Sequence, residues 1–197
     1  MRKIKKTWGE LKKECINLGF DDMDTYTANP TLFTEAANRA INIVASTVRP
    51  VLAKYTVTQE AVETEEEYVV YDIEELTKDG TVKVFAGFSD MDSSVKHRTE
   101  HQKYLLLDAS FNGDFEVWYK KTPERITENT PDDFEIELDY DVAVLVPYLM
   151  CHDLWLDDDV QKAVMYYNKY DDLKNQALAN QSKDTIAAVI APKGWCF

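Results

Sequence analysis

The first fifty residues have the hydrophobic spacing of two helices. Thr7 and Glu10 match a capping box, in which a hydroxyl and a carboxylate three residues later satisfy backbone N–H groups, so a helix is expected to begin there. Gly19 is expected to be the residue that follows the C-terminus of that helix. Pro30 suits the start of a second helix that Pro50 would end. Apolar residues recur in it at intervals of three and four, at Phe33, Ala36, Ala37, Ala40, Ile41, Val44 and Val48.

From about residue 56 the hydrophobic period changes from 3.6 to two, as in β-strands. The runs that predict strands are 68–71, 82–85, 104–107, 115–119 and, as a last strand, 134–138. Asp79-Gly80 and Asn112-Gly113 are dipeptides typical of hairpin turns. The middle of the chain therefore predicts a small antiparallel β domain of roughly five to seven strands.

After residue 138 the helical period returns. Residues 140–156 are apolar on most sides, which predicts the most buried helix, and Pro147 should kink it or mark its start. The acidic residues 157–159 would end this helix and cap the next one. Apolar residues of the next helix share one side, at Val160, Ala163, Val164, Tyr167, Tyr170, Leu173, Ala177 and Leu178. Tyr167, Tyr170 and Trp155 are expected to pack in the core.

These elements predict an α+β protein. Helices from both ends of the chain would form a helical bundle, and an antiparallel β domain, a small sandwich or barrel, would be inserted between them. The expected divisions are a discontinuous helical domain, an inserted β domain and an apolar C-terminal tail, at residues 1–55 plus 138–181, 56–137 and 182–197. A chain of 197 residues suits this organisation.

The net charge of the chain limits the kinds of molecule that it is expected to bind. The chain has 22 Lys and Arg against 36 Asp and Glu, a net charge of −14. With the expected divisions, residues 1–55 carry +3, residues 56–137 carry −13 and residues 138–197 carry −4, so nearly all the acidity is assigned to the β domain. Such a surface opposes tight nucleic-acid binding but is compatible with DNA passing by.

The same sequence bears on the protein's compartment. No apolar run approaches the roughly 20 residues of a membrane helix. Three widely spaced cysteines are typical of free thiols in a reducing compartment. We therefore expect a protein made in a cytoplasm, with no membrane partner.

Two motifs suggest metal sites only in part. His97 and His101 have the spacing of two zinc ligands on a helix, but they lie between predicted strands and lack a third ligand. Residues 108–113 match the first half of a calcium loop, whose twelfth position is Tyr119 where a bidentate Glu is required. We therefore expect no metal ion at either motif.

Signatures of catalysis are also incomplete. Cys151, His152 and Asp153 are adjacent, and neighbours on a helix point about 100° apart, so they do not form a dyad. The six glycines are scattered and form no phosphate-binding loop. We expect no catalytic residue and no cofactor.

Trp118 and Tyr119 are the candidates for an exposed aromatic side chain in the β domain. They are neighbours in a predicted strand, so one of them must face away from the domain core. An exposed aromatic ring suits binding of a sugar or of a partner's surface.

The helical parts of the chain resemble the head-to-tail connector proteins of tailed bacteriophages, also called adaptor or head-completion proteins. The segments that carry the resemblance are 7–12, 33–41 and, above all, 145–159, Leu-Val-Pro-Tyr-Leu-Met-Cys-His-Asp-Leu-Trp-Leu-Asp-Asp-Asp, followed by Tyr166, Tyr167 and Tyr170. In these proteins an apolar helix runs into an acidic break and a tyrosine-rich helix. The resemblance covers about half the chain; the β insertion is matched only in kind.

The resemblance implies a virion structural protein without enzymatic activity, made in the cytoplasm of a bacterial host. It implies a homo-oligomeric ring that docks on the portal protein, meets tail or neck proteins and lets DNA pass without binding it specifically. An apolar C-terminal tail would insert into a neighbour or the portal. Its candidate partner-binding residues are Ile186, Val189, Ile190, Trp195 and Phe197.

Two other functions fit the sequence. One is a recognition module of a phage tail or baseplate, whose β domain binds carbohydrate or a protein partner through Trp118 or Tyr119. The other is a small hydrolase that uses acidic residues of the β domain, although nothing in the sequence singles out a pair of them.

Overall fold

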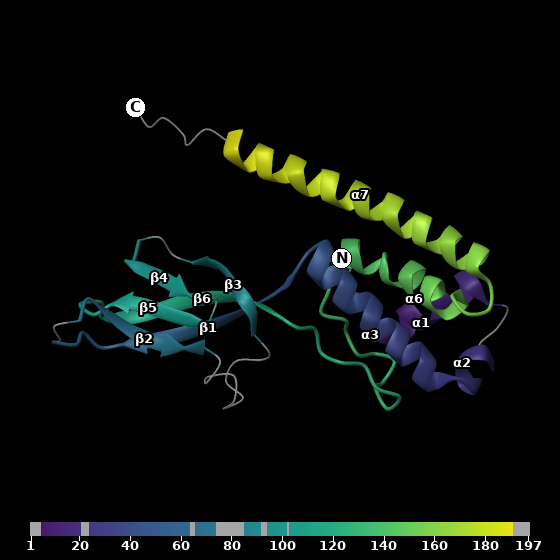
Figure 1. The fold of residues 1–197 in the computed structure, drawn as a ribbon, viewed down its shortest axis with the longest axis horizontal. Helices are drawn as coiled ribbons and strands as arrows, with labels where there is room; N and C mark the ends of the chain where they lie inside the picture. The colour runs from purple at the N-terminus through teal and green to yellow at the C-terminus, as the bar shows by residue number, and fades with distance from the viewer. Residues whose placement is uncertain are drawn as a thin grey trace. The chain divides into compact units, whose positions relative to one another are not determined.

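The computed structural model describes residues 5–20, 24–63, 66–73, 85–91, 94–101 and 103–190. The chain has an α+β fold of two compact units, which confirms the predicted class (Figure 1). One unit is helical and combines Met1–Arg49 with Pro123–Phe197, and the other is Pro50–Thr122 and contains the strands. These boundaries differ from those expected, because a strand already begins at Val51 and residues 123–137 belong to the helical unit.

The described helices of the first unit are α1 (Trp8–Gly19), α2 (Asp24–Ala28), α3 (Pro30–Thr47), α5 (Tyr140–Ala143), α6 (Val146–Trp155) and α7 (Val160–Ile190). The capping box at the start of α1 is confirmed. The Glu10 amide donates to the Thr7 hydroxyl at 3.3 Å, and the Thr7 amide donates to the Glu10 carboxylate at 2.9 Å. Gly19 is the last residue of α1 and not the residue after it.

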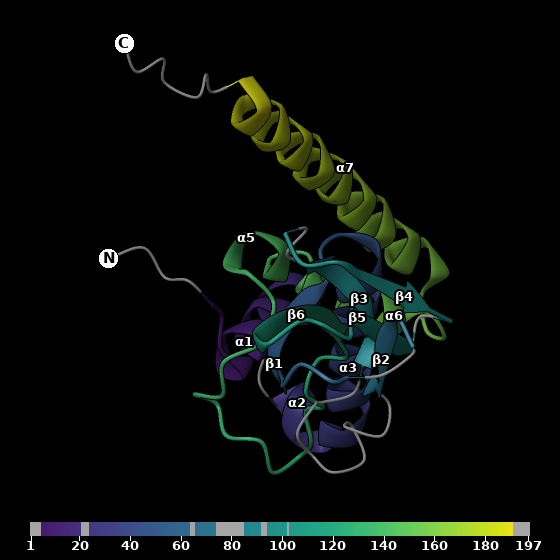
Figure 2. The ribbon, with the colours of Figure 1, turned by 90° about the vertical axis from the view of Figure 1, so that its left-hand side faces the viewer.

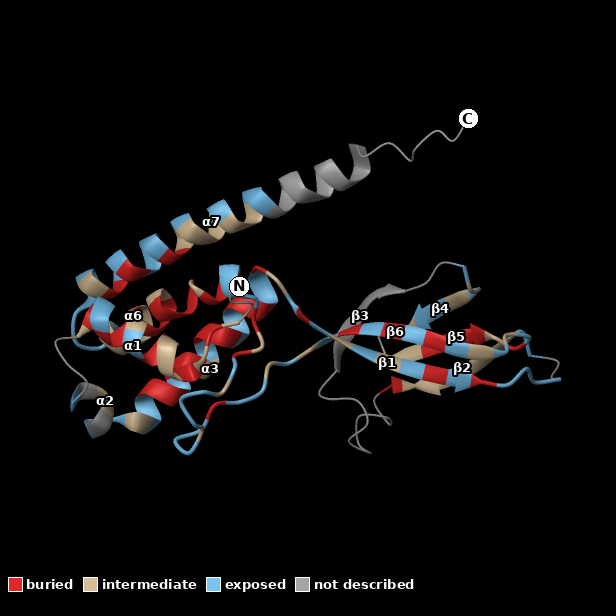
Figure 3. Ribbon diagram, turned by 180° about the vertical axis from the view of Figure 1, so that it is seen from behind, coloured by how far each residue is buried: buried red, intermediate tan, exposed pale blue. Residues whose placement is uncertain are grey.

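Helix α6 is the centre of the helical unit, where it packs against α1, α3 and α7. Its buried residues include Leu149, Met150 and Cys151. The red stretches of α6 in Figure 3 mark its buried positions. Pro147 lies in the first turn, where its missing N–H costs no helical hydrogen bond, so it marks the start of α6 as predicted. The two helices α6 and α7 follow each other through the acidic turn 156–159.

Helix α7 is longer than predicted. It continues to Ile190, so residues 182–190, expected to belong to a non-helical tail, are helical, and residues 191–197 lie outside the described residues. At about 1.5 Å per residue its 31 residues span about 46 Å, against about 15 Å for the ten of α6. Figures 1 and 2 show α7 running along the outside of the helical unit and beyond the end of α6.

Aromatic rings from separate helices form a continuous row in the helical unit. Successive centroids are 5.3–6.5 Å apart in the order Trp8, Tyr26, Phe33, Phe20 and Trp155. A lysine lies near each end of the row: the ammonium of Lys12 is 5.3 Å from the Trp8 centroid and 4.5 Å from the Tyr26 centroid, and that of Lys162 is 3.5 Å from the Trp155 centroid. These contacts stabilise the helical unit both by burying apolar rings and by cation–π attraction.

Residues 134–138, predicted as the last strand of the β domain, lie instead in the helical unit. The Trp8 amide donates to the Phe134 carbonyl at 2.8 Å, and the Ile136 amide donates to the Lys6 carbonyl at 2.8 Å. The alternation of apolar and polar residues still matches their burial in this short pairing with the N-terminal segment: Ile136 and Leu138 are buried, and Glu135 is exposed.

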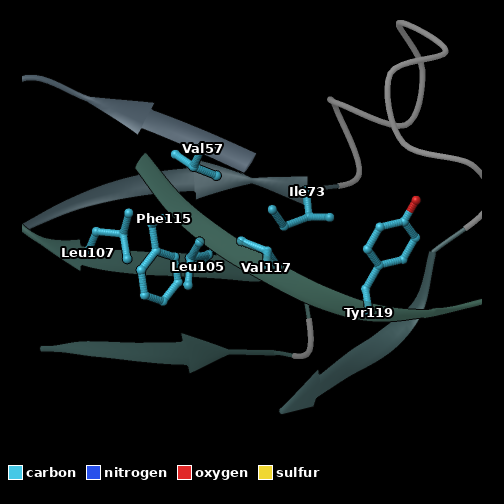
Figure 4. Close-up of a cluster of buried hydrophobic side chains, with 7 residues drawn as sticks. All are labelled: Val57, Ile73, Leu105, Leu107, Phe115, Val117 and Tyr119. Carbon is cyan, nitrogen blue, oxygen red and sulfur yellow. The ribbon is translucent and has the colours of Figure 1, made fainter. Parts of the chain in front are cut away.

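The described strands of the second unit are β1 (Val51–Gln59), β2 (Tyr68–Asp72), β3 (Phe85–Met91), β4 (His97–Glu100), β5 (Tyr104–Asp108) and β6 (Gly113–Lys121). They form two three-stranded antiparallel sheets, in the orders β1-β6-β3 and β2-β5-β4. These strands make a small sandwich and no closed barrel. The buried cluster of Val57, Ile73, Leu105, Leu107, Phe115, Val117 and Tyr119 draws on both sheets (Figure 4).

Asn112-Gly113 is not a hairpin turn. Gly113 is the first residue of β6, and β5 and β6 belong to different sheets, so this connection carries the chain across the sandwich. Gly113 has φ +139°, a backbone conformation that side chains disfavour. The buried amide of Gln59 donates to the carbonyls of Asp108 and Phe111 at 2.8 and 3.1 Å and holds this connection. Asp79-Gly80 and residues 82–84 lie outside the described residues.

Candidate assembly surface

Helix α7 attaches to the helical unit through a narrow face. Ala163, Tyr166 and Tyr170 are buried, at the i, i+3, i+7 spacing of one helical face. The Tyr166 hydroxyl donates to the Leu18 carbonyl of α1, and the Tyr170 hydroxyl lies 3.3 Å from the Thr47 hydroxyl at the end of α3. Among the side chains of α7 whose burial is described, residues 160–180, the buried ones lie in the first turns of the helix (Figure 3). The first part of α7 is therefore held by both α1 and α3.

A second side of α7 exposes apolar residues. Val160, Val164 and Tyr167, which we call the α7 stripe, have the i, i+4, i+7 spacing and exposed fractions of 60%, 47% and 44%. The prediction that Tyr167 packs in the core was wrong, because Tyr166 takes that core position and Tyr167 is exposed, whereas Tyr170 is buried as predicted. At about 100° per residue, the stripe lies about a quarter turn from the buried face.

His152 of α6 fixes one end of the α7 stripe. Its Nδ1 donates to the Ala163 carbonyl at 3.0 Å, and its ring centroid lies 5.2 Å from that of Tyr167. Tyr167 also contacts Tyr170, with centroids 5.9 Å apart. The exposed tyrosine is thus supported on two sides, so a partner would lose little side-chain entropy by packing against it. His152 serves this packing and does not face Cys151, whose thiol points to Cys15.

The acidic turn before α7 caps the helix as predicted. The Asp159 carboxylate accepts a hydrogen bond from the Lys162 amide at 3.0 Å, and the Asp159 carbonyl accepts one from the Ala163 amide at 2.9 Å. Lys162 in turn donates to the Gly19 carbonyl at 3.2 Å from its place over Trp155. These contacts fix the direction of α7 relative to α1 and α6.

The predicted partner-binding residues of the C-terminus are not brought together by the described structure. Ile186, Val189 and Ile190 lie in the last turns of α7, where the structure describes the backbone without the side chains. Trp195 and Phe197 lie outside the described residues. Their role remains a prediction from the sequence.

The two aromatic candidates in the β unit separate clearly. Trp118 is 40% exposed on the outer face of β6, whereas Tyr119 is 4% exposed in the sandwich core. Figure 4 shows Phe115, Val117 and Tyr119 following one another along β6. Tyr119 is therefore not a binding candidate. Lys54 stands opposite Trp118 in the register of β1 and β6, with its ammonium 6.0 Å from the ring centroid, and forms an ion pair with Glu116.

The two metal motifs have structural explanations. His97 lies in β4 with its ring against Phe115. Each residue of a strand advances the chain by about 3.3 Å, so His101, four residues later, does not come beside His97 as it would on a helix. The Asp108 carboxylate accepts hydrogen bonds from the Ser110 amide and hydroxyl at 2.9 and 2.6 Å. Among the described side chains, no three His, Cys, Asp or Glu residues gather as metal ligands.

Within the described ranges, no helix combines the length and apolar composition needed to cross a bilayer. No protein-family model matches the chain, and no curated protein sequence matches it.

Proposed function

We propose that this protein is a virion structural protein of a tailed bacteriophage, a connector that joins the head to the tail. In this proposal it assembles as a ring on the portal, contacts tail or neck proteins and lets DNA pass. The observation that carries the proposal is the α7 stripe, an exposed apolar surface on a long helix whose start is fixed by α1, α3 and α6. The resemblance of residues 145–159 to connector proteins supports it.

The α7 stripe suits contact between subunits because Val160 and Val164 expose apolar area beside Tyr167, whose ring is supported by His152 and Tyr170. Tyrosine is enriched at protein interfaces, where it supplies a large contact area at a small entropic cost. The length of α7 beyond α6 offers further helix surface for side-by-side packing.

The distribution of charge also supports a channel that DNA crosses without adhering. The unit Pro50–Thr122 has eight Lys and Arg against fifteen Asp and Glu, a net charge of −7, so the helical unit holds the other −7 of the −14. The expectation that nearly all acidity lies in the β domain was wrong, because residues 124–137 belong to the helical unit. Net negative charge on both units disfavours phosphate binding.

Light scattering coupled to size exclusion tests the proposal. We expect a ring, either of the protein alone or after mixing with the portal protein of the same phage, and weaker assembly of Val164→Asp. Val62→Asp is the matched control, since Val62 is 48% exposed and Val164 47%, and it lies in the other unit. A protein that stays monomeric alone and with the portal would contradict the proposal, as would its absence from purified particles by mass spectrometry.

A second candidate function is suggested by Trp118. Its exposed ring beside Lys54 fits a recognition module of a tail or baseplate that binds carbohydrate or a protein partner. A glycan array would favour this function if binding were lost in Trp118→Ala and kept in Leu52→Ala, a change at another exposed apolar residue of the unit.

A further inference from the structure

Two cysteines that are 136 residues apart in sequence meet in the core of the helical unit. The sulfurs of Cys15 on α1 and Cys151 on α6 are 3.6 Å apart, and neither side chain is exposed. The Cys151 thiol donates to the Cys15 carbonyl at 3.4 Å, which leaves the Cys15 thiol to donate to the Cys151 sulfur. Both are free thiols in this structure.

The surrounding contacts hold the two helices close at this point. Gly19 lies one turn after Cys15, and a Cβ at that position would come within 2.9 Å of the Cys151 sulfur. Trp155 lies one turn after Cys151, and its indole N–H donates to the Gly19 carbonyl at 3.2 Å. The glycine therefore permits the approach, and the tryptophan fixes it.

We propose that Cys15 and Cys151 are a redox pair that closes into a disulfide between α1 and α6 when the protein leaves a reducing compartment. The oxidant is a small-molecule disulfide such as oxidised glutathione. One thiolate attacks it, forms a mixed disulfide and releases one reduced thiol; the second thiolate then attacks the protein sulfur and releases the other. Two protein thiols are oxidised, one small disulfide is reduced to two thiols, and the two protons of the protein thiols pass through solvent to the released thiolates.

The geometry is close to what this bond requires. A disulfide has an S–S distance of about 2.05 Å, so the sulfurs must approach by about 1.5 Å. The hydrogen bond with Cys151 and burial raise the pKa of the Cys15 thiol well above its ordinary value, which keeps the thiolate scarce. Oxidation of the folded protein is therefore slow and passes through local opening of α1 from α6, so mild denaturant should accelerate it.

The biological setting of the pair rests on the proposed function. A virion protein folds in a reducing host cytoplasm and later enters an oxidising exterior. The pair would leave the subunit uncrosslinked during assembly and lock α1 to α6 after release. The chemistry itself does not depend on that setting.

Intact-mass spectrometry of the purified full chain tests the pair. We use Cys196→Ser to leave two thiols, and incubate the folded protein with oxidised glutathione at low denaturant. The expected product is about 2 Da lighter, yields one tryptic peptide pair joining Cys15 to Cys151, and melts on the order of 10 °C higher. Cys15→Ala and Cys151→Ala, checked for folding by circular dichroism, should lose the peptide pair.

Two results would overturn the proposal. One is glutathione adducts without the joined peptides. The other is unchanged thiols even where hydrogen exchange shows α1 opening. Because no phage particle or portal enters the test, its failure would leave the connector function standing, and absence of the protein from virions would leave the redox chemistry standing.

Discussion

The side chain of Asn38 hydrogen-bonds both backbone polar groups of Ile126. Its amide nitrogen donates to the Ile126 carbonyl at 2.8 Å, and its oxygen accepts from the Ile126 amide at 2.8 Å. Through this pair, α3 holds the segment that returns from the β unit 88 residues later.

Replacing Asn38 by Ala should therefore destabilise the helical unit. The change leaves two polar groups of Ile126 without partners beside its buried side chain, at a cost of about 2–3 kcal/mol. Denaturant unfolding followed by circular dichroism measures the loss. Asn42→Ala, at an exposed position of the same helix, is the control and should change stability by less than about 0.5 kcal/mol.

Gly19→Ala tests the close approach of α1 and α6. The added Cβ would meet the Cys151 sulfur at 2.9 Å and the Trp155 indole nitrogen at 3.2 Å. Overpacking of this kind costs about 1–3 kcal/mol, against a helix-propensity gain of about 1 kcal/mol. We expect a net loss of about 1 kcal/mol in thermal unfolding, whereas Asn17→Ala on the exposed side of α1 should not destabilise. A stabilised Gly19→Ala would show that the helices can separate freely.

Neighbouring positions of β6 should respond very differently to truncation. Tyr119→Ala opens a cavity in the sandwich core and should cost about 3–5 kcal/mol, while Trp118→Ala removes a partly exposed ring and should cost about 1 kcal/mol or less. Hydrogen exchange of the β1–β6 amides reports the stability of this unit. Equal effects of the two changes would contradict the observed orientation of the strand.

The carboxylate of Asp108, at the end of β5, should make the stability of the β unit depend on pH. Hydrogen bonds from the Ser110 hydroxyl and amide hold the pKa of Asp108 below its ordinary value of 3.8. A lowered pKa means that the charged carboxylate supports the fold above pH 3.8 and that this support is lost as the pH falls through the lower value. Carboxyl NMR should show the pKa of Asp108 rising in Ser110→Ala, which keeps the amide donor, and unchanged in Ser46→Ala of the helical unit.

Features governed by neighbours along the chain were predictable from the sequence. The capping box of α1, the start of α6 at Pro147 and the cap at Asp159 depend on groups within four residues of one another. The assignment of β2, β5 and β6 as strands, the alternating burial along β6 and the order of helical and β segments follow from the local sequence in the same way. The α+β class therefore needed no tertiary information.

Contacts between residues far apart in the sequence decided the remaining features. Periodic hydrophobic spacing indicates that one face of a helix or strand is buried, but not which element packs against it. Residues 134–138 pair with the N-terminal segment, Tyr166 displaces Tyr167 from the core, and Cys15 meets Cys151 only through the packing of α1 on α6. The exposed α7 stripe has the same spacing in sequence as a core stripe. Only the positions of α1, α3 and α6 determined which side of α7 is buried and which is left exposed.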